Sequence, residues 1–187
     1  MNMSEPAMKI SDFHEQLPIP FSTFGDWAAL ADLSNVLFLD HQQQCMQGSW
    51  EDAYARLYAF HHLREHAMQI EEQWLIPLYQ SRIAEVPKGG AVKYFMREHA
   101  LIRKNLQSFL QRINHTLSDS NSEEANLVSL FEEYHSFKDL LDHHDSRDRV
   151  FLYRELDTLR LRKELDAVLT SIRSAHREFL DHLERRV

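Results

Sequence analysis

The sequence predicts an all-α protein: an antiparallel up-down four-helix bundle with an additional C-terminal helix and a short N-terminal arm. The 187-residue chain holds only four Gly and five Pro, and none of them follows Gly90, which favours long helices over a sheet with many tight turns. Apolar residues recur at helical spacings of three and four over several long stretches. Short polar or glycine-containing segments separate these stretches, as between the helices of a bundle.

The composition excludes several classes of protein. A net charge of −8 speaks against a protein that binds nucleic acid through its phosphates. Cys45 is the single cysteine, which excludes an intramolecular disulfide and a CxxC metal site and fits a reducing compartment. No apolar run approaches the length of a membrane span, and the first residues lack the pattern of a signal peptide. We therefore expect a cytoplasmic protein that binds neither nucleic acid nor a membrane.

The chain divides into three parts. Residues 1–25 contain three prolines and little periodicity, which is typical of an extended arm. Residues 26–158 contain the four helical stretches of the bundle. Residues 159–187 are strongly charged with leucines interleaved at helical spacing, which predicts an amphipathic helix. This last helix is a candidate for pairing with a second copy in a homodimer.

Breakers and capping residues delimit the first two helices. The first follows the arm and ends at Gly48, a natural left-handed stop. Ser49 and Asp52, three residues apart, read as a capping box that opens the second helix. That helix extends to about Arg82, and Pro77 is expected to bend or loosen its last turns.

The third and fourth helices follow clear loops. The stretch VPKGGA at 86–91 is the clearest loop of the chain, and the third helix then carries an apolar stripe over 92–113. The polar run at 118–124 is the next connection. The fourth helix carries its stripe over 127–151. Short connections between long helices make neighbouring helices antiparallel.

Ionisable residues interrupt these apolar stripes at comparable depth. His41 continues the stripe of the first helix, and His99 occupies a core position of the third. His144 and Asp148, four residues apart, share the core face of the fourth. A buried ionisable group is costly unless it is paired or ligated. A shared metal is the simplest reason for three helices to bury such groups together.

The candidate ligands of the second helix do not share one face. Its two competing stripes place Glu71 on one and His62 with His66 on the other, so either histidine remains a candidate. His66 and Glu71 are five residues apart, which puts them about 140° apart on a regular helix. They converge only if a local π-bulge interrupts the helix, and such bulges favour functional sites.

Four segments carry a resemblance to a known family. They are LDHQQQ around His41, HAMQIEEQWLIPLY at 66–79, GGAVKYFMREHALI at 89–102 and LLDHHDSRDRVFLYRELD at 140–157. Over residues 30–156 the sequence resembles the hemerythrin-like, or HHE cation-binding, family. In that family a four-helix bundle holds two non-haem irons between its helices, with an oxygen-derived bridge and bridging carboxylates.

The resemblance implies a ligand set and a cofactor. Its metal ligands would be His41, His66, Glu71, His99, His144 and Asp148. Further candidates, as ligands or as groups supporting a ligand, are His62, Glu72 and His143. The implied cofactor is two iron ions with an oxo or hydroxo bridge, and manganese or zinc are the alternatives. Imidazoles and carboxylates without a thiolate suit iron or manganese best.

The departures from the family narrow the expected function. Oxygen-carrying members place a second histidine on the third helix, where this chain has Arg103. This difference points away from reversible oxygen carriage, toward binding of a small gaseous or peroxide ligand (oxygen, nitric oxide or peroxide) in sensing, storage or stress protection. A di-iron peroxidase or oxidase is the alternative, and several tyrosines are candidate proton donors for it: Tyr54, Tyr58, Tyr94 and Tyr153. We favour a binding protein over an enzyme.

Metal-free interpretations also stay open. The histidines and Asp148 could form a buried polar cluster without metal, in a helical module that serves only protein interactions. Carboxylates beside the candidate ligands could orient the histidines, because ligating imidazoles usually donate their second nitrogen to a carboxylate or carbonyl. The same carboxylates could equally belong to a solvated face. They are Glu65, Glu72, Glu98 and Asp145.

Overall fold

A computed structural model describes residues 21–118, 123–159 and 162–184 of the chain. Most of the expected N-terminal arm and part of the connection at 118–124 lie outside these residues. The described residues form helices and no strand, which confirms the all-α prediction. The division of the chain into arm, bundle and tail stays a prediction.

Five long helices make up most of the fold, and short helical segments adjoin three of them. The long helices are α2 (Ala28–Met46), α3 (Trp50–Ile70), α5 (Val92–Ser118), α6 (Glu123–Arg147) and α8 (Arg162–Glu184). The short segments are η1 (Gly25–Trp27), η2 (Glu71–Leu75), α4 (Ile76–Arg82), η3 (Asp148–Tyr153) and α7 (Arg154–Thr158). Of these, η2 and η3 are π-helical, and each continues the helix that precedes it.

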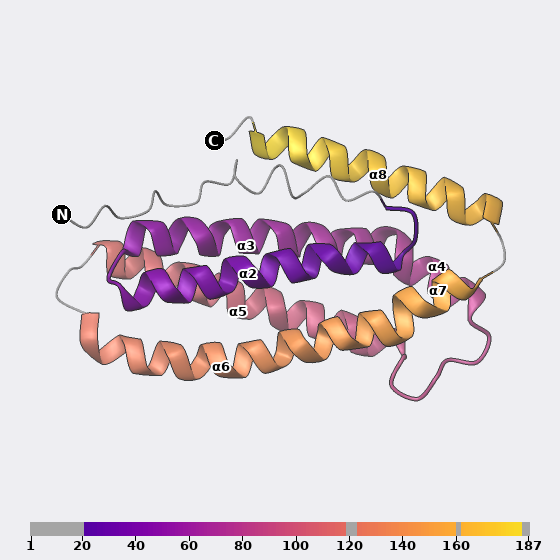
Figure 1. The fold of residues 1–187 in the computed structure, drawn as a ribbon. Helices are drawn as coiled ribbons and strands as arrows, with labels where there is room; N and C mark the ends of the chain where they lie inside the picture. The colour runs from indigo at the N-terminus through magenta and orange to yellow at the C-terminus, as the bar shows by residue number, and fades with distance from the viewer. Residues whose placement is uncertain (1–20, 119–122, 160–161, 185–187) are drawn as a thin grey trace.

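The long helices lie side by side (Figure 1). Helix α3 packs against both α2 and α5, and α5 packs against α6. Helix α8 lies along the side of α2 and α3 that faces away from α6 (Figure 1). The helices therefore enclose a shared core, and the polar groups described below lie inside it.

The junction between α2 and α3 is a tight turn at Gly48. Its φ of 73° is a left-handed conformation that glycine adopts without a steric penalty, as the sequence predicts. Ser49 is the residue at the start of α3, but its side chain makes no capping hydrogen bond. The expected capping box with Asp52 is therefore wrong. The first turn of α3 is instead closed by the backbone, where Ala53 N donates to Ser49 O at 2.8 Å.

Aromatic side chains fill the core between α2, α3, α5 and α6. Phe38 lies with its ring centroid 5.1 Å from that of Phe60 and 5.4 Å from that of Phe137. Phe109 makes edge contacts with Tyr134 at 4.8 Å and with Phe137 at 5.2 Å. Such edge-to-face pairs add to the stabilisation that burial of the rings provides.

The two ends of the described chain are tied to the bundle near η1. The Asp157 carboxylate at the end of α7 accepts from Phe24 N at 2.8 Å and from Gly25 N at 3.0 Å. Arg173 on α8 donates through Nε to Phe21 O at 2.8 Å. These contacts hold Trp27, which follows directly, in the core beside α3.

No helix in the described part of the chain is long and apolar enough to cross a membrane.

We expect Phe109→Ala to lower the free energy of unfolding by about 3–5 kcal/mol, because it removes a fully buried ring and leaves a cavity. Urea denaturation followed by circular dichroism measures the change. Met46→Ala is the control: Met46 is 69% exposed, and its loss should change stability by less than about 0.5 kcal/mol. Equal effects of the two substitutions would contradict the described packing.

Candidate metal centre

Three side chains from three helical segments converge in the core. Glu71 begins η2, His99 lies on α5 and His144 lies on α6. Each offers a ligand atom, and these three atoms all lie within 4.8 Å of one another. All three side chains are buried. The His99 and His144 rings meet edge to face, with their centroids 4.9 Å apart.

A second group overlaps the first on α6 and η3. His144, Asp145 and Asp148 also place one ligand atom each within 4.8 Å of the others. His144 Nε2 lies 3.1 Å from Asp148 Oδ2, one helical turn further along the chain. Because His144 belongs to both groups, the two sets form one continuous buried cluster, which we call the acidic-histidine cluster: Glu71, His99, His144, Asp145 and Asp148.

The two π-helical segments position the carboxylates of this cluster. Glu71 is the first residue of η2, and Asp148 is the first residue of η3. A π-helical turn accommodates one residue more than an α-turn, so it changes which side chains face the core from that point onward. Tyr153, the last residue of η3, donates its hydroxyl hydrogen bond to Glu71 Oε1 and so connects the two segments.

Outside the cluster, each of its two histidines contacts a further carboxylate, and each of these carboxylates is bound by an arginine. His99 Nδ1 lies 2.8 Å from Glu72 Oε1, and Arg103 donates to the same oxygen at 2.7 Å. His144 Nδ1 lies 3.5 Å from Glu98 Oε2, and Arg147 Nε donates to Oε1 of that carboxylate at 2.9 Å. Imidazoles that bind a metal usually have such a carboxylate on the opposite nitrogen.

Several atoms of the cluster lack an aligned hydrogen-bond partner. His99 Nε2 lies 3.0 Å from Glu71 Oε2, yet neither atom makes a hydrogen bond of acceptable geometry. Asp148 Oδ1 is also buried without a hydrogen-bond partner, whereas His144 Nδ1, which makes no aligned hydrogen bond either, faces Glu98 outside the cluster. Buried polar atoms are nearly always satisfied in native proteins, so a group of orphaned ones needs an explanation such as an ion.

The pKa values of the cluster residues are shifted because several carboxylates are buried close together. Burial alone would raise the pKa of Glu71, but contacts with His99, His144 and Tyr153 hold it below its usual range. Burial, together with repulsion from Glu71 and Asp145, raises the pKa of Asp148 well above its ordinary value. Burial alone would lower the pKa of His99, but the neighbouring carboxylates raise it. A bound cation would remove the repulsion among these carboxylates.

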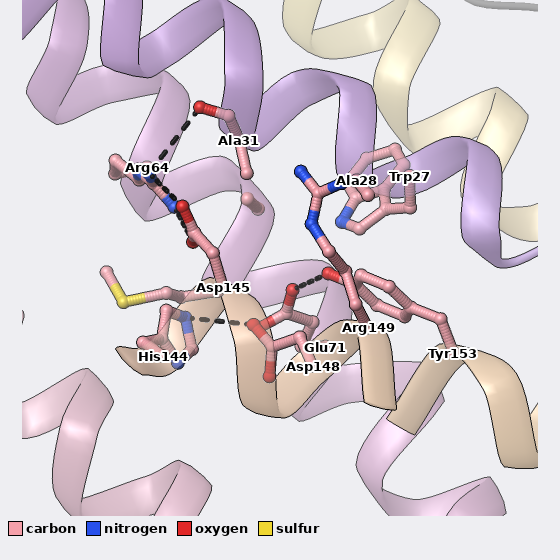
Figure 2. Close-up of a pocket in the computed structure, with 12 residues that line it drawn as sticks. Trp27, Ala28, Ala31, Arg64, Glu71, His144, Asp145, Asp148, Arg149 and Tyr153 are labelled. Carbon is pink, nitrogen blue, oxygen red and sulfur yellow. Dashed lines mark hydrogen bonds and ion pairs between the residues drawn. The ribbon is translucent and has the colours of Figure 1, made fainter. Parts of the chain in front are cut away.

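A small cavity adjoins the cluster (Figure 2). Glu71, His144 and Asp148 line one part of it, and Trp27 and Tyr153 line another. It offers about 10 Å³ of space, roughly the minimum for one buried water. Trp27 Nε1 is buried at its edge without a hydrogen-bond partner. The cavity can therefore hold a water-sized molecule and offers it a hydrogen-bond donor.

The donor set fits a metal ion. Nitrogen and oxygen ligands bind transition metals at about 2.0–2.2 Å, which places any two of them at most about 4.4 Å apart. Ligand atoms spread over no more than 4.8 Å close onto an ion after small side-chain movements. Imidazole and carboxylate donors without a thiolate suit iron, manganese or zinc. The buried cluster could therefore hold a metal ion.

The structure places His41 away from this cluster. Its Nδ1 lies 2.7 Å from Ala53 O, and its Nε2 lies 2.6 Å from the Tyr134 hydroxyl. Because a carbonyl oxygen only accepts, Nδ1 carries the proton and Nε2 accepts from Tyr134. Burial holds the pKa of His41 at about 4. Both nitrogens of this candidate ligand are therefore engaged by other partners.

His66 is also outside the cluster, although the π-helical turn expected beside it is present as η2. Its Nε2 lies 3.1 Å from His176 Nδ1 on α8, and its ring stacks on Phe179 with centroids 4.0 Å apart. Trp27 contacts both imidazoles edge-on. The π-turn thus brings Glu71 to the cluster while His66 faces α8.

The remaining candidates lie around the cluster or at the surface. His62 is half-buried, with its ring 4.3 Å from that of Tyr58. His143 is exposed, and its Nε2 accepts from Arg147 at 2.9 Å. Glu72 supports His99, as described above. Of the six expected ligands, the structure brings together Glu71, His99, His144 and Asp148; whether these four bind a metal stays a prediction.

Two residues of the site were missed or undervalued from the sequence. Arg64 is buried beside the cluster and donates to Asp145, which was expected only as a carboxylate that could orient a histidine. The signal for Arg64 was its place on the same stripe as Glu71, seven residues or about two turns earlier. An arginine in that register is buried, and a buried arginine requires an acidic partner.

Comparisons with protein-family models, with curated proteins and with solved structures find no match to this chain. The cluster is compatible with a hemerythrin-like site, and its assignment rests on the geometry given above.

We expect the free energy of unfolding of the metal-free protein to decrease as the pH is lowered, because His66 resists protonation in the folded state. Burial and the neighbouring His176 lower the pKa of His66 from 6.5 to about 3. Between these values the unfolded chain binds a proton that the folded protein does not, so the free energy of unfolding decreases as the pH falls through this window. The contribution is at most about 1.4 kcal/mol per pH unit and vanishes above the upper value.

Urea unfolding at about pH 5 and at about pH 7 measures this slope. His66→Phe should reduce it, and His135→Phe, at an exposed position of α6, should not. An unchanged slope in His66→Phe would contradict the burial of a neutral imidazole at this position.

Proposed function

We propose that this chain is a metal-binding protein whose acidic-histidine cluster holds a first-row transition metal ion, with iron as the first candidate. Glu71, His99, His144 and Asp148 would be the ligands. The function of the site would be to bind a small oxidant or diatomic molecule (oxygen, nitric oxide or peroxide) for sensing, storage or stress protection.

The observation that carries this proposal is the convergence of buried ligand atoms, of which His99 Nε2 and Glu71 Oε2 make no aligned hydrogen bond. Glu71, His99 and His144 come from three separate helical segments, yet their ligand atoms lie within 4.8 Å of one another. A structural hydrogen-bond cluster would align these groups, whereas His99 Nε2 and Glu71 Oε2 face each other without a hydrogen bond. Two imidazoles with carboxylates and open positions are typical of non-haem iron sites.

The surroundings favour a small ligand over an organic substrate. The adjoining cavity offers about 10 Å³ and is bordered by the bulky side chains of Trp27 and Tyr153. Trp27 Nε1 can donate to a ligand in this space, because no other acceptor engages it. Ala28, Ala31, Ala67 and Met68 form apolar parts of the cavity wall.

The roles of the individual side chains follow from their contacts. A bound ion would supply Lewis acidity and open coordination positions to a small molecule. His99 would be oriented by Glu72 on its Nδ1, which leaves Nε2 directed at Glu71 and the cluster. Tyr153 would fix one oxygen of Glu71 by its hydrogen bond and leave the other for the ion.

The proposal extends to the arrangement of the helices. We take α2, α3 with α4, α5, and α6 with α7 to be the four members of an antiparallel, hemerythrin-like bundle, with α8 as an added helix. The pairwise packing of α2 with α3, α3 with α5 and α5 with α6 supports this arrangement.

A redox enzyme is the second candidate, because Tyr153 lies beside a proposed ligand. Its hydroxyl contacts Glu71 and lines the cavity, where it could donate a proton to a bound peroxide. Burial and the charge of Glu71 and Asp148 raise the pKa of Tyr153, so its phenol stays protonated near neutral pH.

The first test is metal content. Protein loaded anaerobically with iron(II) and desalted should retain iron in proportion to its chains, as measured by elemental analysis. The double variant His99→Ala, His144→Ala should bind at least about 100-fold more weakly, because ligand loss exceeds the effect of losing a supporting contact. His143→Ala is the matched control, since this adjacent histidine is exposed, and it should retain iron. Equal retention in all three proteins would refute the ligand assignment.

Turnover with peroxide and an added reductant separates the two candidate functions. We expect the iron-loaded protein to consume peroxide no faster than free iron, as a binding protein would. If turnover exceeds that of free iron, and Tyr153→Phe lowers it by about 100-fold or more at unchanged iron content, the protein is a redox enzyme and not a binding protein.

A further inference from the structure

Arg64 places a buried positive charge directly beside the acidic-histidine cluster. It lies on α3 about two helical turns before Glu71 and therefore faces the same core. Its side chain is only 2% exposed, which is rare for an arginine. Besides Asp145, its charge acts on both Glu71 and Asp148.

The guanidinium binds Asp145 through both of its terminal nitrogens (Figure 2). NH1 donates to Oδ1 at 2.5 Å and NH2 donates to Oδ2 at 2.9 Å. NH2 also donates to Asn35 Oδ1 at 2.7 Å, and Asn35 in turn donates to Asp145 Oδ2 at 3.1 Å. This bidentate pair, fixed by an amide from α2, is the strong form of a charge-assisted hydrogen bond. Both oxygens of Asp145 are therefore occupied.

From this arrangement we infer that the cluster holds one metal ion and not two, because Arg64 takes the place of a second cation. The inference rests on the proposed function and concerns the number of ions that this site accepts. It departs from the two irons that the family resemblance implies.

The charges of the buried groups support a single ion. Four carboxylates of this region are buried: Glu71, Glu98, Asp145 and Asp148. Arg147 balances Glu98, and Arg64 balances Asp145. One divalent ion balances the other two, so the loaded cluster is neutral. A second divalent ion would require further anions in the core, where an uncompensated charge is costly.

The number of available ligand side chains also favours a single ion. A second ion would need donors beyond those around Glu71, His99 and His144. Asp145 is engaged by Arg64, and the two other expected histidines are engaged elsewhere: His41 by Ala53 and Tyr134, and His66 by His176. Among the described residues, the one imidazole grouped with Asp145 is His144, which also belongs to the group of Glu71 and His99, so a second ion would have to compete for it.

The test counts manganese(II) ions per chain in the full-length protein. After saturation and desalting, elemental analysis should give one ion per wild-type chain. Electron paramagnetic resonance should show the hyperfine pattern of isolated manganese(II), without the signal of a coupled pair. Two ions per chain with a coupled signal would overturn the inference while leaving the proposed function intact. No bound ion, with manganese or with iron, would overturn both.

A substitution then tests whether Arg64 sets this number. Arg64→His removes the cation, frees Oδ1 of Asp145 and adds an imidazole on the face of Glu71, so the count should rise from one ion toward two. Arg56→His is the matched control. Arg56 is also buried on α3 and paired with a carboxylate, Asp40 at 2.7 Å, about 12 Å along the helix from Arg64.

The control should keep one ion per chain. A count of one in a folded Arg64→His variant would contradict the role of Arg64, as would a rise in both variants. If Arg64→His does not fold, the wild-type count and its resonance signal still decide between one ion and two.

Discussion

Burying several carboxylates together is the constraint on which this structure depends. Glu71, Asp145 and Asp148 lie within one helical core, where each charge would be expensive without a partner. Arg64 and the imidazoles of His99 and His144 lie against these carboxylates, and the ligand atoms form two overlapping groups that share His144. The negative charge that remains after these contacts would be compensated by a cation in the cluster.

Two π-helical turns make this convergence geometrically possible. Each begins at a carboxylate of the cluster, Glu71 in η2 and Asp148 in η3, and each lies within an otherwise continuous helical segment. Tyr153 closes the second turn and bonds to the residue that opens the first. The positions of the carboxylates thus depend on backbone irregularities that the rest of the helix packing must support, which is characteristic of functional sites.

The sequence alone predicted the helical class, the turn at Gly48 and the loop before α5, because breakers and apolar spacing are local signals. The core positions of Glu71, His99, His144 and Asp148 were predicted from the same spacing. The surroundings of His41 and His66 could not be, because they depend on Tyr134 and on His176, residues far away in the sequence. The pairing of Arg64 with Asp145 is non-local in the same way.

X-ray absorption at the iron edge of the iron-loaded wild-type protein tests the central claim most directly. If Glu71, His99, His144 and Asp148 hold the ion, the spectrum will show a nitrogen and oxygen shell with the outer scattering of imidazole rings. The account also predicts no scattering from a second iron. An iron surrounded by water oxygens alone, without imidazole scattering, would contradict the assignment of the acidic-histidine cluster as the metal site.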